Sequence, residues 1–124
     1  MELSEMKVLV CDDSILVRKK FKDILTALGV TEIFEAADGQ KAVEMFSECS
    51  PDVIFMDIVM PVKSGIEALE DIKLLDSNAK VVMASTIGTQ SNLATAIKAG
   101  AYDFLQKPVT TEQVEKILNG VSRE

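Results

Sequence analysis

The sequence contains no histidine and no tryptophan, and only two of its 124 residues are cysteines. Without histidine, the chain has no residues for a Ser-His-Asp or Cys-His catalytic group, and most zinc sites are excluded as well. Cys11 and Cys49 show no CxxC spacing and stand in apolar or helical stretches. We therefore expect two reduced thiols in or near the core, as in a reducing cytosol.

Long apolar runs and a basic surface are missing too. No stretch is long enough to span a membrane and the N-terminus has no signal-peptide pattern, so we expect a cytoplasmic protein without membrane contacts. The net charge is −7 and the sequence pI is about 4.6, which argues against nucleic acid as a partner. Hydrophobic residues make up 48% of the chain, enough for one packed domain over 1–124 with its core at about 7–120.

Short β-rich runs alternate with helical patterns along the chain. The expected strands are 7–11, 32–36, 52–56, 80–84 and 103–106. The expected helices are 14–28, 39–49, 65–75, 89–99 and 111–119. Such alternation predicts a parallel sheet with helices on both faces. The first, third and fourth runs are almost wholly apolar, as in interior strands, whereas the second and fifth carry polar residues. We therefore predict an α/β, flavodoxin-like (βα)5 doubly wound sheet with strand order 2-1-3-4-5.

Apolar residues recur within the helices at spacings of three and four. In 14–28 the expected core face is Val17, Phe21, Ile24, Leu25 and Leu28; in 89–99 it is Leu93, Ala94 and Ile97. Thr110 is placed to cap the last helix, with Gln113 three residues on.

Polar side chains follow four of the predicted strands at the end where ligands bind in such sheets. They are Asp12 and Asp13, then Asp57, then Ser85 and Thr86, and finally Lys107. Taken singly, Asp13 has the alternative role of a helix N-cap and Lys107 that of a solvated surface residue. Three carboxylates in one crevice require a cation, and oxygen ligands without histidine favour Mg²⁺ or Mn²⁺.

The motifs "VLVCDDS", "DVIFMDIVMP", "VVMAS" and "DFLQKP" together resemble the receiver domain of bacterial response regulators. The similarity covers about residues 7–120 and is greatest to the single-domain chemotaxis regulators. The resemblance implies that Asp57 accepts a phosphoryl group from a kinase histidine. It also implies a Mg²⁺ site, which consists of Asp12, Asp13, Asp57 and the backbone carbonyl of Val59.

The resemblance further assigns Ser85 and Lys107 to the phosphoryl oxygens, with Thr86 beside them, and implies a cis peptide bond between Lys107 and Pro108. Phe104 matches an aromatic switch position, and plain core packing is the alternative interpretation. The expected chemistry is self-catalysed phosphorylation and slow autodephosphorylation of a signalling switch, not an enzyme acting on external substrates. Departures from the family pattern are Thr86 where Ala or Gly is usual, apolar Val59 and Ile87 beside the phosphoryl site, and Val109 where Phe is common. For Val109 we expect a change of local packing alone.

The implied partners are a sensor histidine kinase or phosphotransfer domain and a downstream target protein, with the flagellar motor switch as one candidate. Because no linker signal follows residue 120, we favour a stand-alone, monomeric chemotaxis regulator. The alternatives are the excised receiver of a larger regulator, a phosphorelay intermediate, and a Mg²⁺-dependent phosphohydrolase. The last is disfavoured because Asp57 has no second acid two residues on. The basic residues Arg18, Lys19, Lys20 and Lys22 form either a solvated face or a docking surface for the phosphodonor.

Overall fold

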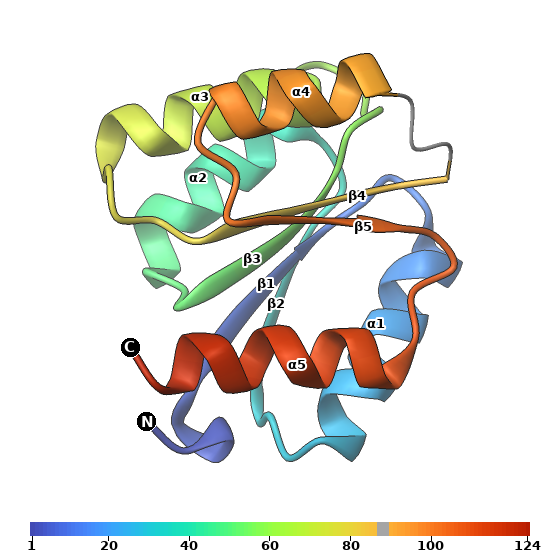
Figure 1. Cartoon of the computed structure of the whole chain (residues 1–124), viewed down its shortest axis with the longest axis vertical. Helices are drawn as coiled ribbons and strands as arrows, with labels where there is room; N and C mark the ends of the chain where they lie inside the picture. Colours follow the sequence, from blue (N-terminus) through green and yellow to red (C-terminus); the bar gives the residue numbers. More distant parts are fainter. Residues whose placement is uncertain (87–89) are drawn as a thin grey trace.

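The computed structural model describes residues 1–86 and 90–124 as one α/β unit (Figure 1). Its sheet has five parallel strands in the order β2-β1-β3-β4-β5, so the predicted fold class and strand order are confirmed. The strands are β1 (Lys7–Cys11), β2 (Glu32–Ala36), β3 (Val53–Asp57), β4 (Val81–Ser85) and β5 (Asp103–Gln106). β3 and β4 each end one residue later than predicted, because Asp57 and Ser85 still pair with Ala84 and Gln106 across the sheet.

The helices cover both faces of the sheet, α1 and α5 on one side and α2, α3 and α4 on the other (Figure 1). Their bounds are α1 (Ile15–Ala27), α2 (Gly39–Cys49), α3 (Gly65–Leu75), α4 (Gln90–Lys98) and α5 (Thr111–Ser122), after a short 3-10 turn at Leu3–Glu5. Thr110 and Gln113 form the predicted capping box of α5, and this helix continues to residue 122 because Val121 is buried against the core. No helix among the described residues is both long and apolar enough to cross a membrane.

The core face predicted for α1 is confirmed. Phe21, Ile24 and Leu25 are buried, and Val17 and Leu28 pack against them. The ring of Phe21 lies 5.2 Å from that of Phe55 on the central strand β3, which ties α1 to the middle of the sheet. Such aromatic pairs add to the energy of burial.

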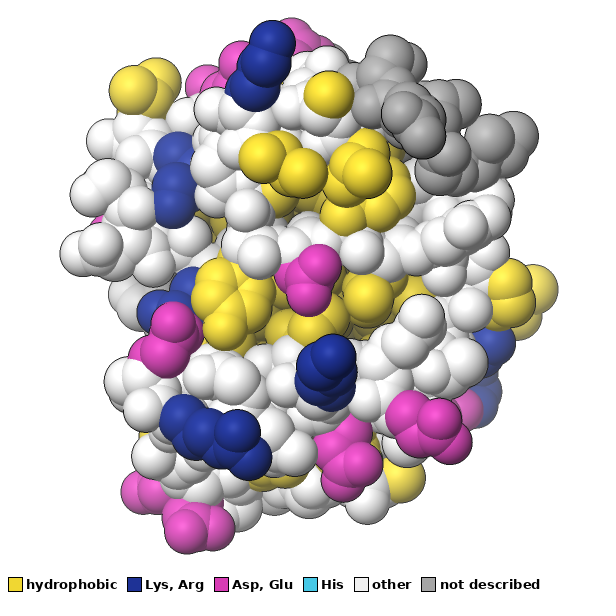
Figure 2. Space-filling view, in the orientation of Figure 1, with side chains coloured by type: hydrophobic (Ala, Val, Ile, Leu, Met, Phe, Trp, Pro, Cys, Tyr) yellow, Lys and Arg dark blue, Asp and Glu magenta, His cyan; other side chains and the backbone are white. Residues whose placement is uncertain are grey.

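The core face predicted for α4 is wrong. Ala96 is fully buried, whereas Leu93 is 37% and Ile97 61% exposed, and Ala94 is exposed as well. This short helix packs on the sheet through its small side chain, and the large apolar ones face outward. Figure 2 shows hydrophobic side chains gathered on this side of the molecule, over α4 and β5. The predicted start of the helix, at residue 89, lies outside the described residues.

The two ends of the chain lie side by side at the edge of the sheet where β1 begins (Figure 1). The Met1 amino group donates to the carbonyl oxygen of Ser122 at 3.1 Å, and Lys80 pairs with Glu124 at 3.6 Å. Both cysteines are free thiols, Cys11 buried and Cys49 half-buried. Burial, reinforced by the negative charge of Asp12, raises the pKa of the Cys11 thiol, so this thiol stays protonated and unreactive.

Candidate functional site

Three carboxylates meet at the carboxyl edge of the sheet, between β1 and β3. Oxygen atoms of Asp12, Asp13 and Asp57 all lie within 4.8 Å of one another. Asp57 ends β3, and the two other residues follow β1, which is the neighbour of β3 in the sheet. Asp12 is 2% exposed, Asp57 is partly buried and Asp13 is exposed. The cluster therefore has a buried floor and one ligand at its mouth, and its oxygen donors suit a hard divalent cation.

The ammonium group of Lys107 lies against this cluster. It forms an ion pair with Asp12 and another with Asp57, whose Oδ1 lies 3.3 Å from Nζ. The Lys107 side chain is 10% exposed, and its backbone N–H donates to the carbonyl of Ser85 at 2.6 Å. The Lys107–Pro108 peptide bond is cis, as the family resemblance implied. The end of β4 thus anchors the loop that carries the lysine.

Burial raises the pKa of the Asp57 carboxyl above its usual value, and the negative charge of Asp12 raises it further. The Lys107 ammonium and the Ile58 N–H lower this pKa without cancelling the effect of burial. Burial therefore disfavours the ionised form of Asp57 in spite of the nearby Lys107 ammonium. A cation placed between the three carboxylates would favour the ionised form.

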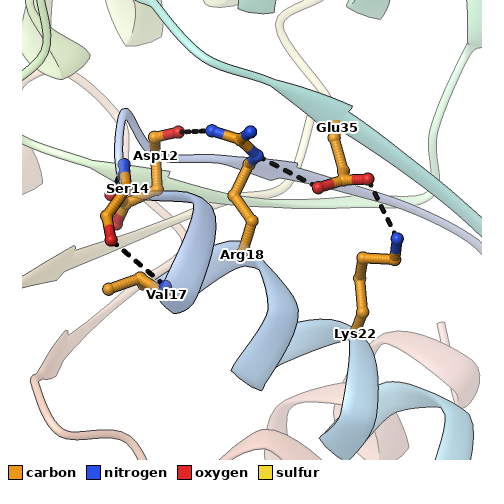
Figure 3. A network of polar contacts seen from close by, with 6 residues as sticks. All are labelled: Asp12, Ser14, Val17, Arg18, Lys22 and Glu35. Carbon is orange, nitrogen blue, oxygen red and sulfur yellow. Dashed lines mark hydrogen bonds and ion pairs between the residues drawn. The ribbon is translucent and has the colours of Figure 1, made fainter.

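The turn after β1 is held by several hydrogen bonds (Figure 3). The Asp12 N–H donates to the Ala36 carbonyl at 3.0 Å, and Asp12 Oδ1 accepts from the Ser14 N–H at 2.9 Å. Arg18 donates to the Asp12 carbonyl oxygen at 2.7 Å. The hydroxyl of Ser14 caps α1 by accepting from the Val17 N–H at 3.3 Å, so the interpretation of Asp13 as the helix cap is wrong.

Sequence reasoning missed the contact made by Arg18, which it placed in a basic patch. The available signal was the position of Arg18 one turn into α1, because helical side chains lean back toward the helix N-terminus. Sequence reasoning also missed the role of Gly65, the first residue of α3. A β-carbon there would lie 1.9 Å from the carbonyl oxygen of Asp57, so only glycine permits α3 to begin this close to β3.

The other predicted site residues lie around the cluster. Ser85 is 7% exposed at the end of β4, and the exposed Thr86 follows it. Val59 lies two residues after Asp57 with 74% of its surface exposed, and Ile87 lies outside the described residues. Phe104 is half-buried on β5, where it packs against the core cluster beneath α3 and α4.

An apolar cavity of about 290 Å³ opens between α1 and the loop from β5 to α5. It is lined by Val17, Lys20, Phe21, Thr86, Lys107, Pro108 and Val109. Val109 is only 5% exposed, so it belongs to the core as well as to the wall of this cavity. The expectation that valine at this position alters local packing alone stays a prediction.

Comparisons with known proteins give concordant matches. The family model described as response regulator receiver domain matches residues 8–119. The chemotaxis protein CheY of Thermotoga maritima is 43% identical over 117 residues, covering 94% of this chain and 98% of that protein. CheY of Bacillus subtilis is 42% identical over 113 residues, covering 91% of this chain and 94% of that protein.

Solved structures agree with these matches. The CheX–CheY–BeF3–Mg²⁺ complex of Borrelia burgdorferi matches with a TM-score of 0.88 at 33% identity, covering 94% of this chain and 88% of that chain. CheY4 of Vibrio cholerae matches with a TM-score of 0.86 at 30% identity, covering 94% of this chain and 98% of that chain.

Proposed function

The chain belongs to the response regulator receiver domains, and we propose that it is a phosphorylation-controlled switch of a two-component system. Its phosphoacceptor is Asp57, which receives the phosphoryl group from a histidine of a sensor kinase or phosphotransfer domain. The observation that carries the proposal is the meeting of three carboxylates and the Lys107 ammonium at one edge of the sheet. The family match over residues 8–119 supports treating 1–124 as one receiver domain.

The donor set fits Mg²⁺, because it consists of carboxylate oxygens around a partly buried centre. Asp12, Asp13 and Asp57 would hold the ion, together with the carbonyl of Val59. When bound, it would neutralise charge on the phosphoryl oxygens. The Borrelia CheY forms its complex with Mg²⁺ and BeF3, which supports the choice of this ion for the present chain. Mn²⁺ offers similar chemistry.

In the proposed transfer, an oxygen of Asp57 forms a bond to phosphorus while the bond from phosphorus to the donor histidine breaks. The products are an acyl phosphate on Asp57 and the donor histidine, which leaves as a neutral imidazole because its other ring nitrogen has taken up a proton from water. Lys107 already lies 3.3 Å from Asp57, so its ammonium is placed to stabilise the transferring group. Ser85 would donate its hydroxyl from the end of β4, and Thr86 stands beside it.

We propose that the output lies on the side formed by α4, β5 and α5. Ser85 and Phe104 occupy the neighbouring strands β4 and β5, so a shift of Ser85 toward the phosphoryl group changes the space available to Phe104. The exposed apolar side chains Leu93 and Ile97 lie on this side of the molecule. Phosphorylation would bias existing conformations of this surface and thereby control the binding of a target protein.

Phosphotransfer tests this proposal. A kinase of the source organism should label the chain once per molecule in the presence of Mg²⁺. The adduct should be stable in acid and labile in base, and Asp57→Asn should abolish it. Repeated turnover of a small phosphate ester by the wild type, without a stoichiometric adduct, would instead show a phosphohydrolase.

The CheY relatives support a role in chemotaxis. If that role is right, the chemotaxis kinase of the same organism labels Asp57 and a flagellar motor component is captured preferentially by the phosphorylated form. The Borrelia CheY was crystallised with CheX, so a protein of that kind is a second candidate to be sought in the same capture. Labelling by a different kinase, with no motor component captured, would remove chemotaxis and leave the receiver function.

A further inference from the structure

The basic residues of α1 are not equivalent in the structure. Lys19 pairs with Asp23 at 3.1 Å on the exposed side of the helix, and both side chains are more than two-thirds exposed. The Arg18 side chain is only 15% exposed, and its Nε donates to Glu35 on β2 at 3.0 Å. The Nη1 atom of the same guanidinium donates to the Asp12 carbonyl oxygen at 2.7 Å (Figure 3). Arg18 therefore joins a buried turn of the acidic site to the neighbouring strand.

The carbonyl that Arg18 holds belongs to the peptide between Asp12 and Asp13. Because a peptide unit is planar, fixing this oxygen also fixes the direction of the Asp13 N–H and the place of the Asp13 Cα, from which its side chain starts. The other polar groups of Asp12 are engaged elsewhere, its N–H with Ala36 and its carboxylate with Ser14 and Lys107. Arg18 thus fixes the orientation of the Asp12–Asp13 peptide, which joins the residue with the buried carboxylate to the residue with the exposed one.

We propose that Arg18 is a positioning residue for the cation site, acting on Asp13 through the Asp12–Asp13 peptide, with Glu35 orienting its guanidinium. The inference rests on the proposed function in so far as the acidic cluster binds a divalent cation. It goes beyond that function, because it assigns Arg18 to the support of the cation site and not to a docking surface for the phosphodonor. Groups that orient metal ligands in this way commonly change metal affinity by 10-fold or more when they are lost.

The sign of the effect separates this role from simple electrostatics. Arg18 is a cation close to an acidic cluster, so by charge alone its removal reduces repulsion and tightens Mg²⁺ binding. A positioning role predicts the opposite, because Asp13 then samples orientations that do not bind. Lys22 provides the matched control, since it carries the same charge on the same helix and pairs with Glu35 at 3.1 Å.

The experiment is titration calorimetry of the full chain with Mg²⁺. We expect Arg18→Gln to weaken binding about 10-fold, the effect typical of lost supporting contacts. Arg18→Lys should weaken it too, because a single ammonium does not reproduce the fork that spans Glu35 and the Asp12 carbonyl. Lys22→Gln should bind Mg²⁺ as tightly as the wild type or more tightly. In the metal-free protein, the amide resonance of Asp13 should shift in both Arg18 variants and stay in place in Lys22→Gln.

Unchanged or tighter Mg²⁺ binding by Arg18→Gln and Arg18→Lys would overturn the inference. Urea unfolding of each variant shows whether it is folded; if Arg18→Gln is not, Arg18→Lys and Glu35→Gln decide the result, and wild-type affinity in both overturns the positioning role. Absence of Mg²⁺ binding by the wild type would contradict the proposed function instead, so the two failures are distinguishable.

Discussion

Gly65 shows how a single residue sets the geometry of the site. Its backbone passes so close to β3 that a β-carbon would overlap the carbonyl of Asp57, and its N–H donates to the Ile58 carbonyl at 2.8 Å. This close approach is a property of the folded chain. For that reason the sequence could predict the meeting of Asp12, Asp13, Asp57 and Lys107 from the strand ends, but neither the need for glycine at 65 nor the contact of Arg18.

We expect Gly65→Ala to destabilise the fold by about 2 kcal/mol, since the backbone must shift to relieve the overlap. The shift moves Asp57, so phosphorylation should slow as well. Urea unfolding and a phosphotransfer time course measure the two effects. Gly29→Ala is the control: Gly29 has a φ of 103° and no atom within 4 Å of the added carbon. It should lose stability through backbone strain and retain the phosphorylation rate.

Val59 leads to a prediction about the lifetime of the acyl phosphate. Its exposed apolar side chain stands two residues after Asp57 and offers no group to hold an attacking water. Val59→Asn should therefore speed autodephosphorylation severalfold, with little change in stability at so exposed a position. The decay of labelled protein after removal of the kinase measures the rate, and equal decay in wild type and variant would contradict the idea.

At the scale of elements, the strands and most helices followed from hydrophobic periodicity, whereas the buried face of α4 did not. Periodicity identifies an apolar side of a helix, but it does not tell whether the chain covers that side. In α4 the small residue Ala96 lies against the core and Ile97 points outward. The polar composition of β2 and β5 was more informative, because both are edge strands.

This arrangement of α4 predicts that substitutions at two adjacent residues change the stability by very different amounts. Ala96→Leu should destabilise the fold by about 1 to 3 kcal/mol through overpacking. Ile97→Gln should change stability by less than about 0.5 kcal/mol, since the side chain is exposed. Thermal or urea unfolding tests both. Equal losses would mean that Ile97 contributes to the core, and a loss of target binding confined to Ile97→Gln would support the proposed output surface.

The link between α1 and β2 predicts a dependence on pH. Burial by itself raises the pKa of Glu35, but hydrogen bonds and charges from Lys22 and Arg18 outweigh it, and the net shift is downward. A carboxylate with a lowered pKa stabilises the fold above its unfolded pKa, about 4.3 for glutamate, and this contribution is lost as the pH falls through the folded value. The stability difference between wild type and Glu35→Gln should therefore be present at neutral pH, shrink as the pH falls below about 4.3, and vanish below the lowered pKa of the folded state. A difference that stayed constant on acidification would contradict this.

At the scale of the whole molecule, the crossover between β1 and β3 brings acids from distant parts of the chain to one place. Carboxylates this close destabilise the fold by mutual repulsion, and a bound cation relieves it. Mg²⁺ should thus stabilise the native state, by about 2.7 kcal/mol when its free concentration is 100 times the dissociation constant. Unfolding in a Mg²⁺ series, with sodium chloride at matched ionic strength, measures this. Asp13→Asn should reduce the gain, and an equal gain from sodium would indicate general screening instead.

The adjacent chain ends have a practical consequence for work on this protein. Met1 and Ser122 touch at the edge where β1 begins, while the acidic cluster lies at the edge where β1 ends. A fluorophore, an affinity tag or a surface linkage placed at either end is therefore separated from the site by the length of the sheet. Either end is therefore suited to labelling or immobilisation. A short peptide linking the two ends would allow circular permutation, with new termini in an exposed loop.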